Sequence, residues 1–490
     1  MRYDALIIGA GLSGLGAGIR LAQFGKRVAI LEKHTVWGGL NSFYKLGGRL
    51  FDSGLHALTN YAPRGERTKP LGRILRQLRI DHDALELGEQ SWSAVRFPGI
   101  ELRFSNDLAL LRSEIARAFP GEADAFERLL ADLPGYELLD GSSSGRSARA
   151  ELAGRFREPL LVEMLLCPLC YYGGAREHDL DWQQFAILFR AIFLEGFARP
   201  AGGIRPVLDL LVKRYKAEGG ELRLRAGVAR IVVERGVDRA LDRGVDRGIA
   251  RDFDRGAAHG RVRGVVLENG EELDAEHVYS SAGWVETLAL CPPEHARGVG
   301  PVEPGPLSFF ESLTVTAEEP RALGFDGTAV FFNDSPRFDY RSPDALVDPH
   351  SGVICTPNNY ATTEPLTEGL LRVTLLANHA KWRALDPERY VAEKARAAEL
   401  ALAAAARFAF DVRGKAVFQD TFTPLTIERF TGHAGGAVYG SAHKRPDGKT
   451  GIDGLSLVGT DQGFVGIVGA LLSGITVVNR RALEGAGSAS

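Results

Sequence analysis

The most constraining feature of the sequence is the stretch DALIIGAGLSGLGAGIRLAQFGKRVAILEK, which covers residues 4–33. An apolar run at 5–8 predicts a strand buried on both faces, and a second apolar run at 28–31 ends at Glu32. Between the runs stand three glycines in the spacing G-x-G-x-x-G, namely Gly9, Gly11 and Gly14. This spacing allows a tight turn, a close approach of the backbone to a pyrophosphate and close packing of a helix, while the acid accepts hydrogen bonds from ribose hydroxyls. The stretch predicts a Rossmann-like unit that binds a dinucleotide at a helix N-terminus.

The composition narrows the class of protein. A chain of 490 residues suggests about two to three domains, and 45% hydrophobic with 25% charged residues is typical of a globular protein. A net charge of −3 argues against a nucleic-acid partner, and four cysteines fit a reducing compartment better than a disulfide scaffold. The early first strand leaves no room for a cleavable signal, and no apolar run is long enough to span a membrane. We therefore expect a cytoplasmic protein, with peripheral membrane association compatible with that location.

The segment GGLNSFYKLGGRLFDSGLHAL at 38–58 identifies the dinucleotide. It carries the paired glycines Gly38 and Gly39, and its F-D-S-G-L-H loop ends at His56. With these motifs the sequence resembles the superfamily of flavin-containing amine oxidases and phytoene desaturases, and the histidine resembles the carotenoid isomerase and retinol saturase branch. The resemblance implies that the paired glycines lie against the pyrophosphate of FAD and that the histidine loop passes beside the isoalloxazine ring. Leu40 departs from the pattern, because many relatives carry Arg there.

A second glycine-rich stretch, LSLVGTDQGFVGIVGALLSGITVVNR, lies near the C-terminus at 455–480. It resembles the last piece of the discontinuous FAD-binding domain of this superfamily. The resemblance implies that Asp461 hydrogen-bonds the ribityl or pyrophosphate region and that the backbone at Gly466 passes the ring edge. The helix that starts near Val468 would direct its positive end at flavin N1 and O2, a stabilisation of about 0.3–1 kcal/mol.

The middle of the chain returns to the same domain. A helix is predicted from about Pro206 to Ala217, and Val228 begins a V-x-x-I motif whose backbone, by the resemblance, lies near the adenine. Asn269-Gly270 predicts a hairpin turn. The predicted fold class is α/β: a discontinuous Rossmann-like FAD-binding domain with an interleaved α+β substrate domain. The expected FAD-binding segments are 1–56, 200–301 and 445–490, with a low-complexity hairpin insertion at 235–260, and the expected substrate-binding segments are 57–199 and 302–444.

These patterns predict one non-covalently bound FAD. The expected cofactor-binding residues are Gly9, Gly11, Gly14, Glu32, Lys33, Gly38, Gly39, Val228, Gly459, Asp461, Gly466, Ile467 and Val468. His56 is the first candidate for a catalytic base, with a structural histidine as the alternative, and Glu428 and Tyr439 are weaker candidates. No histidine spacing suggests a metal site. Cys167 and Cys170 are spaced like a zinc or redox pair, but their apolar flanks favour buried structural cysteines.

The predicted function is FAD-dependent redox chemistry or double-bond isomerisation on an apolar isoprenoid or polyene. A quinone or oxygen is the expected electron partner, because no second G-x-G-x-x-G unit offers a site for NAD(P)H. One alternative is an amine oxidase on a polar substrate, although no Trp follows Trp382 to frame the amine. The other is a non-enzymatic prenyl-lipid binder, similar to GDP-dissociation inhibitors, which needs no flavin. The apolar helix expected at 181–197 is either core, the wall of an apolar tunnel or a membrane-dipping entry.

Overall fold

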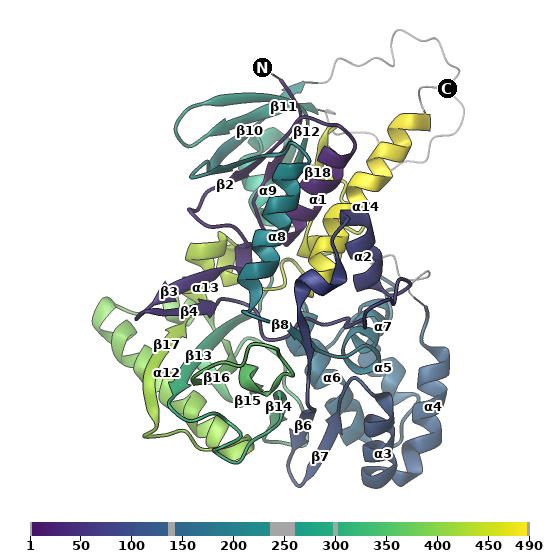
Figure 1. Ribbon diagram of the computed structural model, residues 1–490, viewed down its shortest axis with the longest axis vertical. Coiled ribbons are helices and arrows are strands. Elements are labelled where there is room, and N and C mark those ends of the chain that lie inside the picture. The colour runs from purple at the N-terminus through teal and green to yellow at the C-terminus, as the bar shows by residue number, and fades with distance from the viewer. Residues whose placement is uncertain (1, 136–142, 236–259, 297–301, 488–490) are drawn as a thin grey trace.

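The computed structural model describes residues 2–135, 143–235, 260–296 and 302–487, and Figure 1 shows two sheets arranged along its long axis. Within these residues, each of the two large sheets has seven strands. The segment 236–259, which contains almost all of the predicted insertion, lies outside the described residues. Its flanking strands form the antiparallel pair that a hairpin requires, with residue 235 opposite Gly260.

The first sheet is a Rossmann-like layer assembled from distant parts of the chain. Its parallel strands run in the order β18-β12-β1-β2-β9, and the antiparallel strands β10 and β11 extend it beside the start of β12. β1 and β2 are buried along nearly their whole length, which explains their continuous apolar runs. The strands are β1 (Tyr3–Ile8), β2 (Val28–Glu32), β9 (Glu221–Leu224), β10 (Val228–Arg235), β11 (Gly260–Leu267), β12 (Glu272–Ser280) and β18 (Leu455–Leu457).

The helices α1 (Leu12–Gln23), α8 (Ile204–Ala217) and α14 (Gly466–Gly487) pack together beside this sheet. Glycines bring α1 and α14 into backbone contact. A Cβ on Gly474 would lie 2.1 Å from the carbonyl oxygen of Ser13, and a Cβ on Gly16 would lie 2.9 Å from that of Leu471. The two glycine-rich stretches of the sequence therefore form one packed unit.

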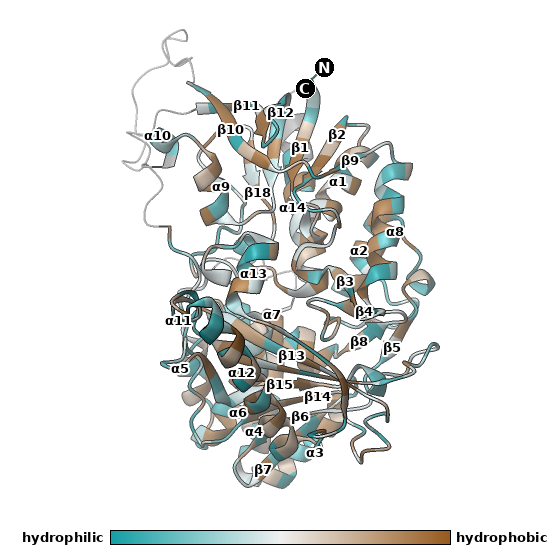
Figure 2. Ribbon diagram, turned by 90° about the vertical axis from the view of Figure 1, so that its left-hand side faces the viewer, coloured by the Kyte–Doolittle hydropathy of each residue, from teal (hydrophilic) through white to brown (hydrophobic). Residues whose placement is uncertain are grey.

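The second sheet is mainly antiparallel, in the order β17-β13-β16-β15-β14-β6-β7. Only β14 and β6 pair in parallel among its described strands. Figure 2 shows these strands largely in the brown of hydrophobic residues, and every residue of β13 is buried. The strands are β6 (Ser93–Phe97), β7 (Ile100–Phe104), β13 (Ser308–Thr316), β14 (Ala329–Asn333), β15 (Val347–Cys355), β16 (Gly369–Ala377) and β17 (Ala416–Phe422).

Helices cover both faces of the second sheet. The alanine-rich α12 (Pro387–Phe408) packs on one face through a cluster that includes Phe310 and Val373. A helical layer covers the other face through a larger cluster with Phe331 and Val353. That layer comprises α3 (Leu108–Ala118), α4 (Ala123–Asp132), α5 (Ala148–Ala153), α6 (Pro159–Gly173), α7 (Trp182–Phe189) and a π-helical turn at Arg190–Leu194.

The most apolar helix of the sequence belongs to this core. Phe189 and Phe193 are 0% and 1% exposed, and their ring centroids lie 5.0 Å apart. The core alternative is therefore confirmed for this helix, because its aromatic side chains are buried against the helices and the sheet. The alternatives of a tunnel wall or a membrane-dipping entry are wrong, since none of residues 181–197 is among those that line the cavity. Cys167 and Cys170 are likewise fully buried in α6, and burial raises the pKa of both thiols.

Shorter elements connect the two sheets. The hairpin β3–β4 lies where the chain first crosses from one sheet to the other (Figure 1), and α13 lies close to it. None of the described helices is both long and apolar enough to cross a bilayer. The connecting elements are β3 (Phe43–Leu46), β4 (Arg49–Asp52), α2 (Pro70–Leu78), β5 (Leu87–Glu89), β8 (Ala198–Pro200), α9 (Trp284–Leu290), α10 (Pro293–Ala296), α11 (His379–Arg383) and α13 (Pro424–Thr431).

The strands of the first sheet come from three separate stretches of the chain, and those of the second from two others. The exact domain limits predicted from the sequence stay predictions.

Candidate functional site

A cavity of about 1070 Å³ joins the two sheets. This is at the upper end of the volumes usual for ligand sites, which run to about 1,000 Å³. Its lining extends from residues of β10 and α9, past the N-terminus of α1, to aromatic residues of the second half of the molecule. Representative lining residues along this path are Val228, Leu290, Gly9, Gly11, Gly39, Gly466, His56, Phe309 and Tyr171.

The first glycine turn fits a pyrophosphate. Gly9 has φ +94°, and a Cβ on Gly14 would lie 2.1 Å from the carbonyl oxygen of Gly9, so both positions need glycine for the fold itself. Gly11 differs, because a Cβ there would meet nothing closer than the Cα of Gly39, at 4.0 Å. The space beside Gly11 belongs to the cavity, and α1 begins there without a side-chain cap on its free N–H groups.

The paired glycines lie directly against this turn. Gly38 and Gly39 have φ +115° and +59°, and the N–H of Gly38 donates to the carbonyl of Ala10 at 2.9 Å. A Cβ on Gly39 would lie 3.3 Å from the Cα of Gly11. Two glycine turns from different segments therefore form one wall of the cavity.

Glu32 is 6% exposed at the end of β2 and lines the cavity. Its two carboxylate oxygens accept from the N–H of Ala10 at 2.8 Å and of His34 at 2.9 Å. A carboxylate has about four acceptor positions, so two remain for ribose hydroxyls. The neighbouring Lys33 is exposed and also lines the cavity, as Val228 does.

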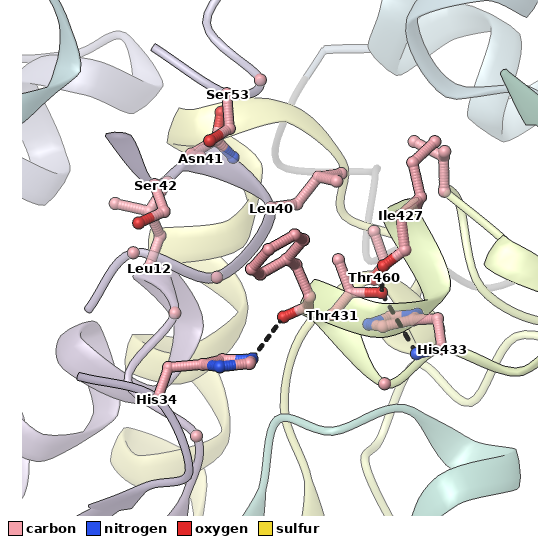
Figure 3. Close-up of a pocket in the computed structure, with 18 of the residues that line it drawn as sticks. Leu12, His34, Leu40, Asn41, Ser42, Ser53, Ile427, Thr431, His433 and Thr460 are labelled. Carbon is pink, nitrogen blue, oxygen red and sulfur yellow. Dashed lines mark hydrogen bonds between the residues drawn. The ribbon is translucent and has the colours of Figure 1, made fainter. Parts of the chain in front are cut away.

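The opposite wall comes from the segment around α13. Figure 3 shows Leu12, Leu40 and Asn41 on one side of the cavity, with Ile427 and Thr431 on the other. His34 joins the two sides, because its Nε2–H donates to the carbonyl oxygen of Phe430 at 2.6 Å.

The C-terminal stretch divides into residues in the lining and residues behind it. Gly459, Gly466 and Ile467 line the cavity, with α14 beginning at Gly466 rather than near Val468. Val468 packs into the core instead.

Asp461 lies behind the lining and is 3% exposed. Its oxygens accept from the N–H groups of Ser441 at 2.8 Å and Trp284 at 2.5 Å. The ammonium of Lys444 lies 3.7 Å from this carboxylate, and burial lowers the pKa of Lys444 to about 8. Asp461 thus holds three segments together, and the direct cofactor contacts expected of Asp461 and Val468 stay predictions.

His56 lies where the glycine-lined part of the cavity meets its aromatic part. Its Nε2 lies 3.0 Å from Oε2 of Glu311 and 3.0 Å from Oγ1 of Thr374. These partners face each other on the paired strands β13 and β16. Arg372, two residues before Thr374 on β16, forms an ion pair with the other oxygen of Glu311. Although burial acts to raise it, the charges of Arg372 and His56 lower the pKa of Glu311 to about 2.

Two buried arginines hold the loop that carries His56. Arg372 is 1% exposed and donates to the carbonyl oxygens of Ser53 at 2.6 Å and Leu55 at 2.9 Å. Arg199 pairs with the carboxylate of Asp52, which also accepts from the N–H of Ile204 at 2.9 Å. The loop is therefore fixed to β16 and to the start of α8.

Sequence reasoning missed Glu311, Thr374, Arg372 and Arg199. A signal was present, because Glu311 and Arg372 are single charges inside the apolar strands SFFESLTVT and GLLRVTLLA. A lone buried charge needs a partner, but the sequence does not say which one.

The two weaker candidates for a catalytic base already interact with other residues of the protein. Glu428 forms ion pairs with His379, at 2.9 Å, and with Arg383, and it is not among the residues that line the cavity. Tyr439 does line the cavity, but its hydroxyl donates to the carbonyl oxygen of Tyr171. Among the described residues, no group of three or more His, Cys, Asp or Glu side chains is arranged to hold a metal ion.

Comparisons with known proteins agree with this geometry. Residues 7–77 match the family model of the NAD(P)-binding Rossmann-like domain. The phytoene desaturase (neurosporene-forming) of Rhodobacter capsulatus is 26% identical over 300 residues, covering 57% of this chain and 52% of that protein. The chloroplastic prolycopene isomerase of Arabidopsis thaliana is 22% identical, covering 98% and 83%. The all-trans-retinol 13,14-reductase of Danio rerio is 23% identical, covering 97% and 86%. The chain thus spans about half the length of the desaturase and most of the other two.

Solved structures share the fold. An oxidoreductase from Methanosarcina mazei has a TM-score of 0.64 at 17% identity, covering 97% of this chain and 99% of that one. Putrescine oxidase bound to putrescine has a TM-score of 0.58 at 15% identity, covering 99% of both. The predicted fold class is confirmed. The chain is therefore a homologue of phytoene desaturases, prolycopene isomerases and retinol reductases, built on the fold of the amine oxidase-type oxidoreductases.

Proposed function

We propose that this protein is an FAD-dependent oxidoreductase that acts on CH–CH groups of an apolar isoprenoid or polyene, by desaturation, saturation or cis–trans isomerisation. The observation that carries the proposal is a single cavity that joins a dinucleotide cradle to an aromatic chamber, with His56 where the two meet. The names of the relatives support the same substrate class, since they refer to phytoene, prolycopene and retinol.

The residues present fit FAD. The space beside Gly11 would take the pyrophosphate, Glu32 the ribose hydroxyls, Val228 the adenine, and the start of α14 at Gly466 and Ile467 the isoalloxazine ring. When bound, FAD supplies the exchange of a hydride with a substrate carbon. Among the residues that the structure describes, no cysteine lines the cavity, so none of them is placed to form a thioether bond to the flavin.

The chamber itself favours an apolar substrate. Its walls include Tyr171, Tyr172, Phe309, Val353 and Val438, which exclude water from the reacting carbon atoms. A cationic amine would favour an unpaired carboxylate beside the catalytic position, but the charge of Glu311, which contacts His56, is already neutralised by Arg372. This pairing favours the polyene over the amine oxidase alternative. The glycine cradle and Glu32 in turn favour a flavoenzyme over a prenyl-lipid binder that needs no flavin.

The route of the substrate and the electron acceptor belong to the same proposal. Leu46 and Leu50 are 43% and 47% exposed on the β3–β4 hairpin, and Leu46 also lines the cavity beside the exposed Lys45. Exposed apolar side chains next to a cation suit the surface of an anionic bilayer, so we propose a cytoplasmic protein that docks there peripherally and takes up its substrate at this hairpin. A quinone or oxygen is the proposed acceptor.

Anaerobic flavin spectroscopy tests the function. Purified protein reconstituted with FAD is mixed with a panel of carotenoids, retinoids, quinols and amines. We expect a polyene or retinoid to bleach the oxidised flavin or, for the reductive direction, to reoxidise the reduced flavin. Response to water-soluble amines alone would contradict the proposal, and protein that cannot be loaded with FAD would refute it.

A further inference from the structure

The residues around His56 form an ordered chain of charges. Arg372 and Glu311 are both buried, and their opposite charges compensate each other. The guanidinium also donates to backbone carbonyls of the 51–56 loop, so its position is fixed from two directions. His56 contacts only the outer oxygen of this pair, and its side chain keeps 22% of its surface exposed.

The hydrogen bonds between Arg372, Glu311 and His56 determine which nitrogen of the His56 ring carries the proton. An ionised carboxylate only accepts hydrogen bonds, so the Nε2 that lies 3.0 Å from Glu311 must carry the hydrogen. Nδ1 of a neutral ring then holds the free lone pair. Within the described part of the chain, Nδ1 makes no hydrogen bond to another residue, and the ring lines the cavity.

A purely structural role for His56 does not account for its contact with Glu311, because the loop and the carboxylate are both stabilised without the imidazole. Arg372 and Arg199 already hold the loop through the carbonyl of Leu55 and the carboxylate of Asp52. Glu311 already has a full counter-charge in Arg372. Neither the loop nor the buried carboxylate needs the imidazole, whereas a positioned base needs this arrangement of an orienting carboxylate behind the ring.

We propose that Glu311, held in turn by Arg372, is the positioning residue that sets His56 in the Nε2–H tautomer and presents Nδ1 to the substrate as the proton acceptor. The inference rests on the proposed function. In the desaturation direction, one C–H bond of the substrate gives a hydride to the oxidised flavin. The C–H bond on the adjacent carbon then breaks, its electron pair becomes the new π bond, and its proton passes to Nδ1. Glu311 stabilises the imidazolium that forms, and saturation runs the same transfers in reverse.

The tautomer can be measured without any substrate. In FAD-loaded protein labelled with [15N]histidine, in mildly alkaline buffer, NMR distinguishes protonated from unprotonated ring nitrogens, and the His56→Gln variant identifies the signals of His56. We expect Nε2 protonated and Nδ1 unprotonated in the wild-type protein. A proton on Nδ1 would overturn the proposal, whatever the substrate is.

Variants test the cause of the tautomer. In Glu311→Gln, whose amide both donates and accepts, His56 should lose its single tautomer, and Glu311→Asp should restore it in part. Thr374→Val should leave the tautomer unchanged, because its hydroxyl accommodates either form. Asp334→Asn is a matched control, since it breaks a remote His350–carboxylate pair with a 2.8 Å contact, and it should change neither the signals of His56 nor turnover.

Turnover separates this inference from the proposed function. With the polyene or retinoid that changes the flavin spectrum, Glu311→Gln should slow the reaction by at least about 10²-fold, the lower end of what a positioned proton-transfer group contributes. Folded Glu311→Gln with unaltered tautomer or rate would overturn the positioning role. If His56 shows the expected tautomer but no polyene or retinoid changes the flavin spectrum, the positioning role of Glu311 is upheld and the proposed function is contradicted.

Discussion

At the scale of single residues, the three motif glycines have different reasons to be glycine. Gly14 is required by the protein, because its Cβ would collide with the carbonyl of Gly9 at 2.1 Å. Gly11 has φ −69° and an empty space beside it, so the fold itself does not require glycine there. The sequence motif treats these positions alike, whereas the structure separates a glycine required for packing from one that borders the open cavity.

This difference gives a paired prediction. Gly11→Val should leave the thermal unfolding of the FAD-free protein nearly unchanged and weaken FAD binding at least tenfold, because the side chain occupies the pyrophosphate space. Gly14→Ala should instead destabilise the FAD-free protein itself, by about 1–3 kcal/mol, as overpacking usually does. Calorimetry of the apo-protein and fluorescence titration with FAD measure the two effects. Equal FAD affinity in Gly11→Val would show that the phosphate lies elsewhere.

Glu311 should make stability depend on acid pH. Its pKa is about 2 in the folded protein against 4.5 as a free group, so its ion pair stabilises the fold fully above pH 4.5 and progressively less as the pH falls toward 2. The linkage amounts to about 3 kcal/mol at most. Urea unfolding of wild type and Glu311→Gln across this range should show a difference in unfolding free energy that shrinks on acidification. A constant difference would mean that Glu311 is not ionised in the folded state.

The residue scale also shows where sequence reasoning stopped. Gly9, Glu32 and His56 could be predicted because each belongs to a local motif. Glu311 and Arg372 could not be joined to His56, since strands distant in sequence bring them together and the choice of partner is a property of the sheet register.

At the scale of elements, periodicity predicted type and position well. The helix expected at 206–217 is observed at Ile204–Ala217, and the hairpin turn at Asn269-Gly270 joins β11 to β12. The apolar helix was harder, because a stripe of phenylalanines looks the same whether it faces a core or a lipid. Only its neighbours decide, and one of them is Phe104 from the second sheet, whose ring centroid lies 4.9 Å from that of Phe193.

Polar substitution should therefore lower the stability of the protein in α7 but not in the β3–β4 hairpin. Phe189→Ser in α7 should cost about 3–5 kcal/mol of stability, the range for removing a buried aromatic ring. The double change Leu46→Ser and Leu50→Ser on the exposed β3–β4 hairpin should leave stability within about 0.5 kcal/mol, as surface changes do, and should weaken sedimentation with anionic liposomes. FAD content serves as the control for folding. Unchanged liposome binding of the hairpin variant would remove the hairpin as the membrane contact.

At the scale of the whole molecule, the cavity depends on both sheets at once. Its lining takes Gly11 and Glu32 from the first sheet region and Glu311 and Thr374 from the second. The discontinuous order of segments could be predicted from the two glycine-rich stretches and their resemblance to known flavoproteins. The size of the cavity and its aromatic end could not, because they follow from how the two sheets meet.

Cofactor binding should consequently stabilise both halves together. A ligand present at 100 times its dissociation constant adds about 2.7 kcal/mol to a cooperative unit. Hydrogen exchange followed by mass spectrometry should show FAD slowing exchange in β1–α1 and also in the 51–56 loop and β13. Protection confined to the first sheet would indicate that the second sheet does not sense the cofactor.

The contact of α1 with α14 has a consequence for how the protein is made. A ribosome releases Gly9 to Gly39 early, but Gly459 and the start of α14 emerge more than 400 residues later. Until then α1 exposes the glycine-lined surface on which α14 will pack. We therefore expect the proposed cofactor to bind only after α14 has emerged, and a premature stop before α14 to leave an unfinished cradle.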